Sequence, residues 1–89
     1  MYYVYLLQSQ VDHEWYIGYT SNLRRRLVEH NRGDTISLVY RRPLNLIYYE
    51  AYLHKKDATG RERFLKSGSG HRFLKKQLMS FLERSCLYP

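Results

Sequence analysis

Two tyrosines near the N-terminus have a spacing that can bring their side chains onto one face of a hairpin. Tyr5 and Tyr16 lie eleven residues apart, and the polar segment 9–13 between them is typical of a turn. A hairpin through that turn can place both side chains on one face of a sheet as cross-strand neighbours. A tyrosine side chain can stack on a base and hydrogen-bond a phosphate, whereas a tyrosine in a strand ordinarily packs against the sheet. Both interpretations are open here. Gly18, directly after Tyr16-Ile17, indicates a bulge or a close backbone approach.

Arg26 and His30 share one flank of a predicted helix. They are four residues apart, so they face the same way, and they lie beside the apolar stripe of Leu23 and Leu27. An arginine there can bind a phosphate, and the ordinary pKa of histidine suits a general base. The alternatives are an arginine that lies along the surface and a structural histidine with satisfied hydrogen bonds.

Glu62 is an isolated carboxylate in a basic segment. Between residues 55 and 76 the only carboxylates are Asp57 and Glu62. On a helix Glu62 shares a face with Ala58 and Leu65, which directs it toward the sheet. An inward carboxylate needs a cationic partner. That partner is either an arginine in an ion pair or a divalent metal such as magnesium, held by one carboxylate, waters and phosphate oxygens.

An ordered set of elements must bring these residues together. Runs of aromatic, β-branched and leucine side chains predict strands over residues 2–8, 15–19 and 44–53. A first helix is predicted to follow the capping residues 20–22 and to end at Gly33, after which residues 34–43 form a polar, basic connection. Further helices are predicted over residues 55–66 and 71–83, separated by a break at residues 67–70. The order β-β-α-β-α-α predicts an α/β (α+β) fold in one domain, residues 1–89, with a small three-stranded antiparallel sheet flanked by helices.

Composition narrows the classes of partner and compartment. Fifteen Lys and Arg against eight Asp and Glu give a net charge of +7, which suits a polyanionic partner such as nucleic acid and equally suits simple solubility. The single cysteine, Cys86, excludes an internal disulfide framework and fits a reducing compartment. No apolar run is long enough to cross a membrane, and the N-terminus has the pattern of a strand, not of a signal peptide. We therefore expect a cytoplasmic protein without a membrane partner, as a monomer or weak dimer.

The ordered motifs resemble the GIY-YIG nuclease superfamily, and within it the small stand-alone bacterial branch. Tyr16-Ile17-Gly18 is identical to the second half of the signature, and Tyr3-Val4-Tyr5 stands where the first half belongs. Arg26, ten residues after Tyr16, stands at the place of the catalytic arginine of the family, and Glu62 matches its metal-binding glutamate. The resemblance covers nearly the whole chain.

This resemblance implies a metal-dependent endonuclease that hydrolyses phosphodiester bonds in nucleic acid, DNA in preference to RNA. Glu62 would hold one Mg²⁺ or Mn²⁺, and Arg26 would bind the scissile phosphate. Tyr16 would act as general base toward the attacking water, and Tyr5 would position that water. His30 is the alternative base.

The remaining basic side chains are expected to contact the nucleic-acid backbone without reading its sequence. They are Arg24, Arg25, Arg41, Arg42, Lys55, Lys56, Arg61, Arg63, Lys66, Arg72, Lys75 and Lys76.

Two features depart from the family pattern. The first motif has no glycine, and the C-terminal asparagine of many family nucleases has no evident counterpart, with residues 66–68 or Gln77 as candidate replacements. The alternative functions are a nucleic-acid-binding module of the same fold without catalysis, and a structural or interaction domain.

Overall fold

The computed structural model describes residues 1–87 and has the predicted antiparallel sheet at its centre. The sheet has the strand order β2-β1-β3, so the N-terminal strand is central and pairs antiparallel with both neighbours. The elements, in chain order, are β1 (Tyr2–Ser9), β2 (Trp15–Thr20), α1 (Leu23–Arg32), the 3₁₀ helix η1 (Ile36–Arg41), β3 (Leu44–Tyr52), α2 (Lys55–Leu65), α3 (Gly68–Gln77) and α4 (Met79–Leu87). The predicted fold class is confirmed, whereas the domain boundary at residue 89 includes two residues outside the described range.

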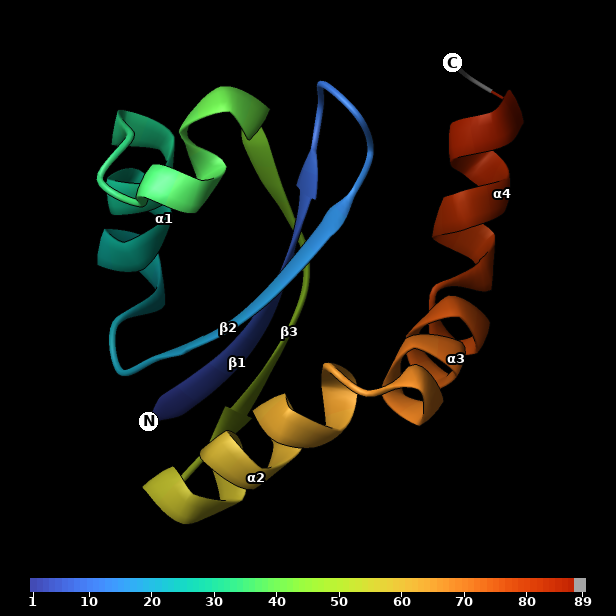
Figure 1. Cartoon of the computed structure of the whole chain (residues 1–89). Helices are drawn as coiled ribbons and strands as arrows, with labels where there is room; N and C mark the ends of the chain where they lie inside the picture. Colours follow the sequence, from blue (N-terminus) through green and yellow to red (C-terminus); the bar gives the residue numbers. More distant parts are fainter. Residues whose placement is uncertain (88–89) are drawn as a thin grey trace.

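The two faces of the sheet are covered by different helices (Figure 1). Helix α1 and η1 cover one face, and α2 with α3 covers the other. Strand β1 is buried on both sides because its side chains alternate between two cores: Tyr5 and Leu7 face α1, whereas Val4 and Leu6 face α2 and α3. This central position explains the unbroken apolar and aromatic run at the N-terminus. None of the helices in the described part of the chain has the length and hydrophobicity needed to cross a bilayer.

A one-residue irregularity in β3 changes which face its side chains join. Leu6 pairs with Tyr48 but Leu7 pairs with Leu46, so Ile47 is the extra residue of a bulge. Leu46 therefore lies in the core beneath α1, and Tyr48 lies in the core beneath α2 and α3. Without the bulge both side chains would point to the same face.

Helix α1 begins and ends where the sequence predicts. The side chain of Asn22 accepts a hydrogen bond from the backbone N–H of Arg25, which caps the first turn. Gly33 ends the helix in a left-handed conformation, with φ of 97°, that residues with a Cβ adopt at a cost. These ends fix the rotation of α1 and therefore the direction of the side chains at positions 26 and 30.

The predicted boundaries of the helices after Leu65 were wrong. Residues 67–70 do not break the chain: the Ser67 hydroxyl caps α3 by accepting from the Gly70 N–H, and the helix starts at Gly68 instead of residue 71. A Cβ at Gly70 would lie 2.1 Å from the Phe64 carbonyl oxygen, so glycine there allows α3 to pack against the end of α2. The helix predicted over residues 71–83 is divided at Leu78 into α3 and α4, and the predicted connection at 34–43 contains η1.

Candidate active site

Tyr5 occupies the centre of the candidate site and is almost completely enclosed. It lies opposite Gly18 on β2, and a Cβ at that glycine would be 2.3 Å from the Tyr5 hydroxyl oxygen. The glycine of the second motif is therefore a close approach, as its place inside a strand indicated, because the Tyr5 ring passes over it. The side chain of Tyr5 is only 2% exposed, and this burial raises its pKa to about 12. Tyr5 consequently keeps its proton at neutral pH.

His30 holds the Tyr5 hydroxyl from the side of α1. Its Nε2 lies 2.8 Å from the Tyr5 oxygen and its Nδ1 lies 2.7 Å from the Thr35 hydroxyl, just beyond the helix. The residue is fully buried, and burial followed by the positive charge of Arg26 lowers its pKa. A neutral imidazole donates one of these hydrogen bonds and accepts the other. Both ring nitrogens of His30 are therefore hydrogen-bonded, and its contact with the Tyr5 hydroxyl orients Tyr5.

Tyr16 lies on the same face as Tyr5, but the two are diagonal neighbours. Tyr16 pairs with Leu7, two residues along β1 from Tyr5, so the two tyrosines are cross-strand neighbours in a diagonal arrangement. The Tyr16 ring packs edge-on against His30, with 5.5 Å between ring centroids. Tyr16 is only half-buried and lines a hollow of about 300 Å³ together with Arg41 and Leu38. Of the two tyrosines, Tyr16 is the one that solvent reaches.

Arg26 places a cation beside the Tyr5 hydroxyl. Interaction with Tyr5, and then with Glu29, raises the pKa of Arg26, and in return Arg26 opposes the rise in the pKa of Tyr5. Its Nη1 lies 3.1 Å from a Glu29 oxygen, and the side chain is 36% exposed. Glu29 also interacts with Arg25 at 3.8 Å. Arg26 is therefore a partly exposed cation whose acidic partner is shared with a second arginine.

Glu62 approaches from the other covering layer, on α2. It is 22% exposed, as its position between the buried Ala58 and Leu65 predicted, and its negative charge contributes to the raised pKa of Tyr5. Its ion-pair partner is Lys66, one turn along the helix with 3.1 Å between nitrogen and oxygen, and not the arginine that we considered. Such an exposed i,i+4 pair contributes about 0.3–0.5 kcal/mol, so a divalent cation could displace the lysine.

The candidate site thus joins groups from both faces of the sheet. We call Tyr5, Tyr16, Arg26 and His30 the Tyr5 cluster. Within residues 1–87 no group of three or more His, Cys, Asp or Glu side chains has the geometry of a metal site. The donor set that faces this region is a single carboxylate with a displaceable partner. That set fits Mg²⁺ or Mn²⁺ held largely by waters and substrate phosphate oxygens.

The basic residues expected to contact nucleic acid do not gather on one surface. Arg24, Arg25, Arg41 and Arg42 lie on α1, η1 and the segment after it, on one face of the sheet. Those at positions 55, 56, 63, 66, 72, 75 and 76 lie on α2 and α3, which cover the other face. All are exposed except Arg42, whose Nε donates to the Val39 carbonyl at 2.7 Å.

Arg61 is not available for phosphate contact, and its true role was missed in the sequence. It forms two parallel hydrogen bonds, of 2.9 and 3.1 Å, to the carboxylate of Glu50 on β3. Glu50 also accepts hydrogen bonds from the hydroxyls of Tyr48 and Tyr52 at 2.5 and 2.6 Å. We call these four residues the Glu50 cluster. The i, i+2, i+4 spacing of Tyr48, Glu50 and Tyr52 in a strand was the available signal.

Thr35 was also missed, because a lone threonine in a polar connection carries no periodic signal. Its hydroxyl reaches His30 only because Gly33 turns the chain back over the end of α1. The candidate replacements for the family asparagine lie apart from one another: Lys66 pairs with Glu62 at the end of α2, and Gln77 is exposed at the end of α3.

Comparison with known proteins gives consistent matches. Residues 1–76 match the model of the GIY-YIG catalytic domain family. A UPF0213 protein of Pediococcus acidilactici is 38% identical over 77 residues, covering 83% of this chain and 78% of the relative. A UPF0213 protein of Streptococcus pyogenes is 40% identical over 65 residues, covering 72% and 70% of the two chains. One of Clostridium perfringens is 37% identical over 67 residues, covering 74% and 71%. No solved structure matches the chain.

Proposed function

The chain belongs to the GIY-YIG family, and from this membership we propose that it is a divalent-metal-dependent endonuclease acting on nucleic acid, DNA in preference to RNA. The observation that carries the proposal is the convergence on Tyr5. Tyr16 from β2, Arg26 from α1 and Glu62 from α2 all lie close enough to Tyr5 for their charges to affect its pKa. A phenol, a cation and a carboxylate are the kinds of group that hydrolysis of a phosphodiester needs, and these three lie within electrostatic range of Tyr5.

Each residue has a role that its surroundings support. Arg26 binds the scissile phosphate, since its guanidinium is partly exposed and can leave Glu29 to Arg25. Tyr16 first releases its own hydroxyl proton to solvent. Its phenolate oxygen then takes a proton from the attacking water as the water oxygen bonds to phosphorus, and the bond from phosphorus to the 3′ oxygen breaks. The leaving oxygen takes a proton from solvent, and Arg26 offsets the negative charge that develops on the phosphate.

Tyr5 and His30 position the groups that take part in this reaction. The Tyr5 hydroxyl, protonated and held by His30, presents its remaining hydrogen-bonding capacity toward Arg26 and the attacking water. Glu62 would hold Mg²⁺ or Mn²⁺ after displacement of Lys66. When bound, such an ion supplies Lewis-acid polarisation of a phosphate oxygen and stabilises the leaving oxygen.

A panel of labelled substrates tests the proposal. Single-stranded, duplex and branched DNA, and RNA, are incubated with the protein in Mg²⁺, in Mn²⁺ and in EDTA. We expect cleavage of at least one substrate with metal and none with EDTA or with Glu62→Ala. The matched control is Asp57→Ala, which removes an exposed carboxylate from the same helix and should leave the rate unchanged.

The second candidate, a binding module without catalysis, is favoured by one observation. Lys66 occupies the carboxylate that would hold the metal. In that case the wild-type protein and Glu62→Ala would retard the same nucleic acids equally, and no substrate would be cleaved with either metal. That combination of results would refute the nuclease proposal while leaving the fold assignment intact.

A further inference from the structure

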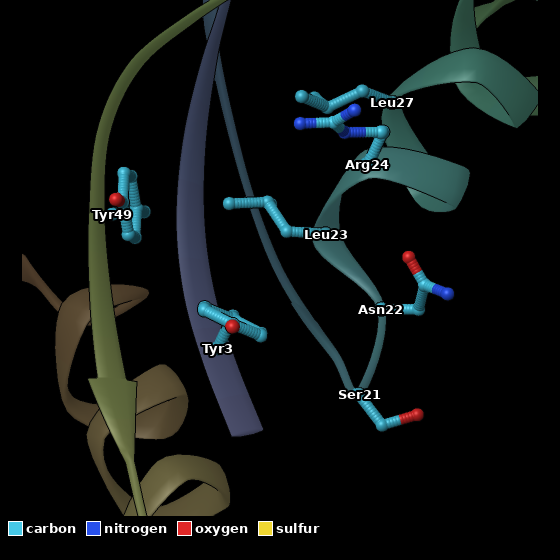
Figure 2. A pocket seen from close by; sticks show the side chains of 7 residues that line it. All are labelled: Tyr3, Ser21, Asn22, Leu23, Arg24, Leu27 and Tyr49. Atoms are coloured by element: carbon cyan, nitrogen blue, oxygen red, sulfur yellow. The ribbon is translucent and has the colours of Figure 1, made fainter. Parts of the chain in front are cut away.

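An open groove lies between α1 and the sheet, on the β3 side of the helix. It has a volume of about 500 Å³. Tyr3 and Tyr49 form its wall on the sheet, and Leu23, Arg24 and Leu27 form its wall on α1. The proposed catalytic residues do not line it. Figure 2 shows the two tyrosines on adjacent strands and the Arg24 side chain extending from α1 toward them.

The two tyrosine rings give the groove an aromatic wall with free faces. Their centroids are 6.1 Å apart and the rings are tilted by 60°, so the two rings are not stacked face to face. Tyr49 is 52% exposed although it lies in a strand of the sheet. Within the described residues neither hydroxyl has a hydrogen-bond partner on the protein. An exposed aromatic ring of this kind is a platform on which a planar group can stack.

The charge of the groove is positive and is not neutralised. Arg24 is exposed and has no carboxylate within ion-pair distance among residues 1–87, whereas the next two arginines, Arg25 and Arg26, both pair with Glu29. No acidic side chain lines the groove. The site therefore combines a flat apolar platform with one unpaired guanidinium, which is complementary to a base joined to a phosphate.

We propose that this groove binds an unpaired segment of the nucleic-acid substrate, with one base stacked on Tyr49 and the adjoining phosphate at Arg24. The inference rests on the proposed function, and it adds to it a site outside the catalytic residues and a preference for unpaired strand. A base within a duplex keeps both faces covered by its neighbours, so only an unpaired base can stack on Tyr49.

The groove and the Tyr5 cluster lie on opposite flanks of the same helix. Arg24 and Arg26 are two positions apart in the sequence, so their side chains leave α1 about 160° apart. Ser21 and Asn22, which precede the helix, line the open end of the groove. A strand that passes this end spans roughly one helix diameter, about 10 Å. At about 3.4 Å per stacked nucleotide, the stacked base lies roughly three nucleotides from the scissile phosphate.

Binding measured without cleavage tests this site directly. The affinity of the full chain for a labelled oligothymidylate 12-mer and for a blunt 12-base-pair duplex is determined by fluorescence anisotropy in EDTA. We expect Tyr49→Ala to weaken binding of the oligothymidylate roughly tenfold and to leave duplex binding unchanged. Tyr49→Phe, which keeps the ring, should bind like the wild type. Tyr40→Ala, which removes a tyrosine that is 92% exposed on η1, should have no effect.

Arg24→Ala provides an independent arm, because its exposed side chain can be removed without disturbing the core. We expect the slope of log affinity against log salt concentration to become less steep by about 0.7, the value for one phosphate contact to a single strand. Tyr49→Ala should leave that slope unchanged, and Arg84→Ala, an exposed arginine on α4, should change neither affinity nor slope. Circular dichroism verifies that each variant is folded.

The outcomes separate this proposal from the proposed function. If Tyr49→Ala and Arg24→Ala bind the oligothymidylate like the wild type, the groove is not a strand site, even where the protein cleaves nucleic acid. If both variants lose affinity but no substrate is cleaved with any metal, the groove proposal stands and the nuclease proposal fails. If free thymidine monophosphate binds as tightly as the oligothymidylate, the groove is a mononucleotide site and the strand proposal is wrong.

Discussion

The Tyr5 cluster and the Glu50 cluster are built from similar residue types on opposite faces of one small sheet, yet they differ in how completely their charges are paired. In the Glu50 cluster a single carboxylate accepts two hydrogen bonds from Arg61 and one from each of two tyrosines. Arg61 also lies over the rings of Phe64 and Phe73, at 5.1 and 4.6 Å. The guanidinium and both tyrosine hydroxyls thus donate to the same carboxylate. Through Arg61 the cluster joins β3 to α2 and α3.

The Tyr5 cluster has a satisfied interior and an unsatisfied edge. Tyr5, His30 and Thr35 form a closed chain of hydrogen bonds, and no buried side-chain nitrogen or oxygen in the described residues lacks a partner. In contrast, Arg26 shares its partner Glu29 with Arg25. Glu62, which lies outside this cluster on α2, pairs with the exposed Lys66. Tyrosine, arginine and glutamate therefore stabilise a fold when they are paired with one another. The same residues form a candidate site when their charges remain exchangeable.

The largest expected effect is the loss of cleavage on removing Arg26. If the Tyr5 cluster is the catalytic one, Arg26→Ala should lower kcat by about 10²–10³-fold, the typical cost of removing one group that stabilises transition-state charge. The midpoint of thermal unfolding should change little, because Glu29 keeps Arg25 as a partner. Single-turnover cleavage and circular dichroism of the same preparation measure both quantities. Arg26→Lys keeps the charge without the planar fork and should recover only part of the rate. Cleavage by Arg26→Ala at the wild-type rate would contradict the assignment of catalysis to the Tyr5 cluster.

Removing Arg61 from the Glu50 cluster should lower the stability of the fold and leave cleavage unchanged, the reverse of the effect expected for Arg26. Arg61→Ala leaves the Glu50 carboxylate, whose side chain is 15% exposed, without its cation. We expect a loss of about 2–3 kcal/mol in the free energy of unfolding, since the pair is enclosed but not fully buried. For a domain of this size the unfolding midpoint should fall by roughly 10 °C or more. Urea denaturation gives the free energy, and cleavage per folded molecule should be retained.

The control for Arg61→Ala lies on the same helix. Arg63 is exposed and has no ion pair among the residues described, so Arg63→Ala should leave the unfolding free energy within about 0.5 kcal/mol of the wild type. Equal losses in the two variants would show that pairing with Glu50 does not account for the stability that Arg61 contributes.

Much of this arrangement could be predicted from the sequence, because local rules determine it. The hairpin follows from two apolar runs and a polar turn, and α1 follows from its capping residue, its stripe and its terminal glycine. These elements also fix Tyr5, Tyr16, Arg26 and His30 relative to one another. The inward direction of Glu62 followed from helical spacing with Ala58 and Leu65.

The remaining features depend on contacts between distant segments. The bulge at Ile47 places Glu50 on the face of α2, and no local pattern marks it. The sequence therefore predicted Arg61 to be an exposed cation. Its pairing with Glu50 depends on the register of β3, which the sequence does not show. The sequence predicted a break at residues 67–70 because glycine is unfavourable inside a helix. Gly70 is needed there because α3 packs closely against the backbone of Phe64 and Leu65, a contact that no local pattern shows.

Removing one tyrosine hydroxyl from each cluster should lower the free energy of unfolding by a smaller amount, and by different amounts in the two clusters. Tyr5→Phe leaves the Nε2 of the fully buried His30 without a partner, which costs about 1–3 kcal/mol. Tyr52→Phe removes one of the hydrogen bonds to a carboxylate that keeps Arg61 and Tyr48, so a loss of about 1 kcal/mol is expected. Urea denaturation at pH 7 compares the two variants. A larger loss for Tyr52→Phe would mean that the Glu50 cluster, and not His30, depends most on a single hydroxyl.

The smallest expected effect is a difference in the pH range over which each cluster loses stability. Burial lowers the pKa of His30, so the unfolded chain takes up this proton near the ordinary value of 6.5 while the folded chain resists it. Stability from His30 therefore falls as the pH drops below 6.5. Burial alone would raise the pKa of Glu50, but the hydrogen bonds from Arg61 and the two tyrosines outweigh it and lower the pKa. Stability from Glu50 is present above its ordinary value of 4.5 and is lost as the pH falls further.

Unfolding free energies measured in urea between pH 7 and pH 3.5 separate these two contributions. His30→Gln should flatten the dependence between pH 7 and 5 and leave the acid limb in place, whereas Glu50→Gln should flatten only the limb below pH 4.5. The two ring nitrogens of His30 already face oxygen atoms that accept hydrogen bonds, so a proton is resisted by enclosure and by Arg26, not by a lack of acceptors. Arg26→Ala should accordingly weaken the dependence between pH 7 and 5 without abolishing it. A dependence that is unchanged in His30→Gln would show that the imidazole is protonated as readily in the folded as in the unfolded chain, contrary to its burial beneath α1.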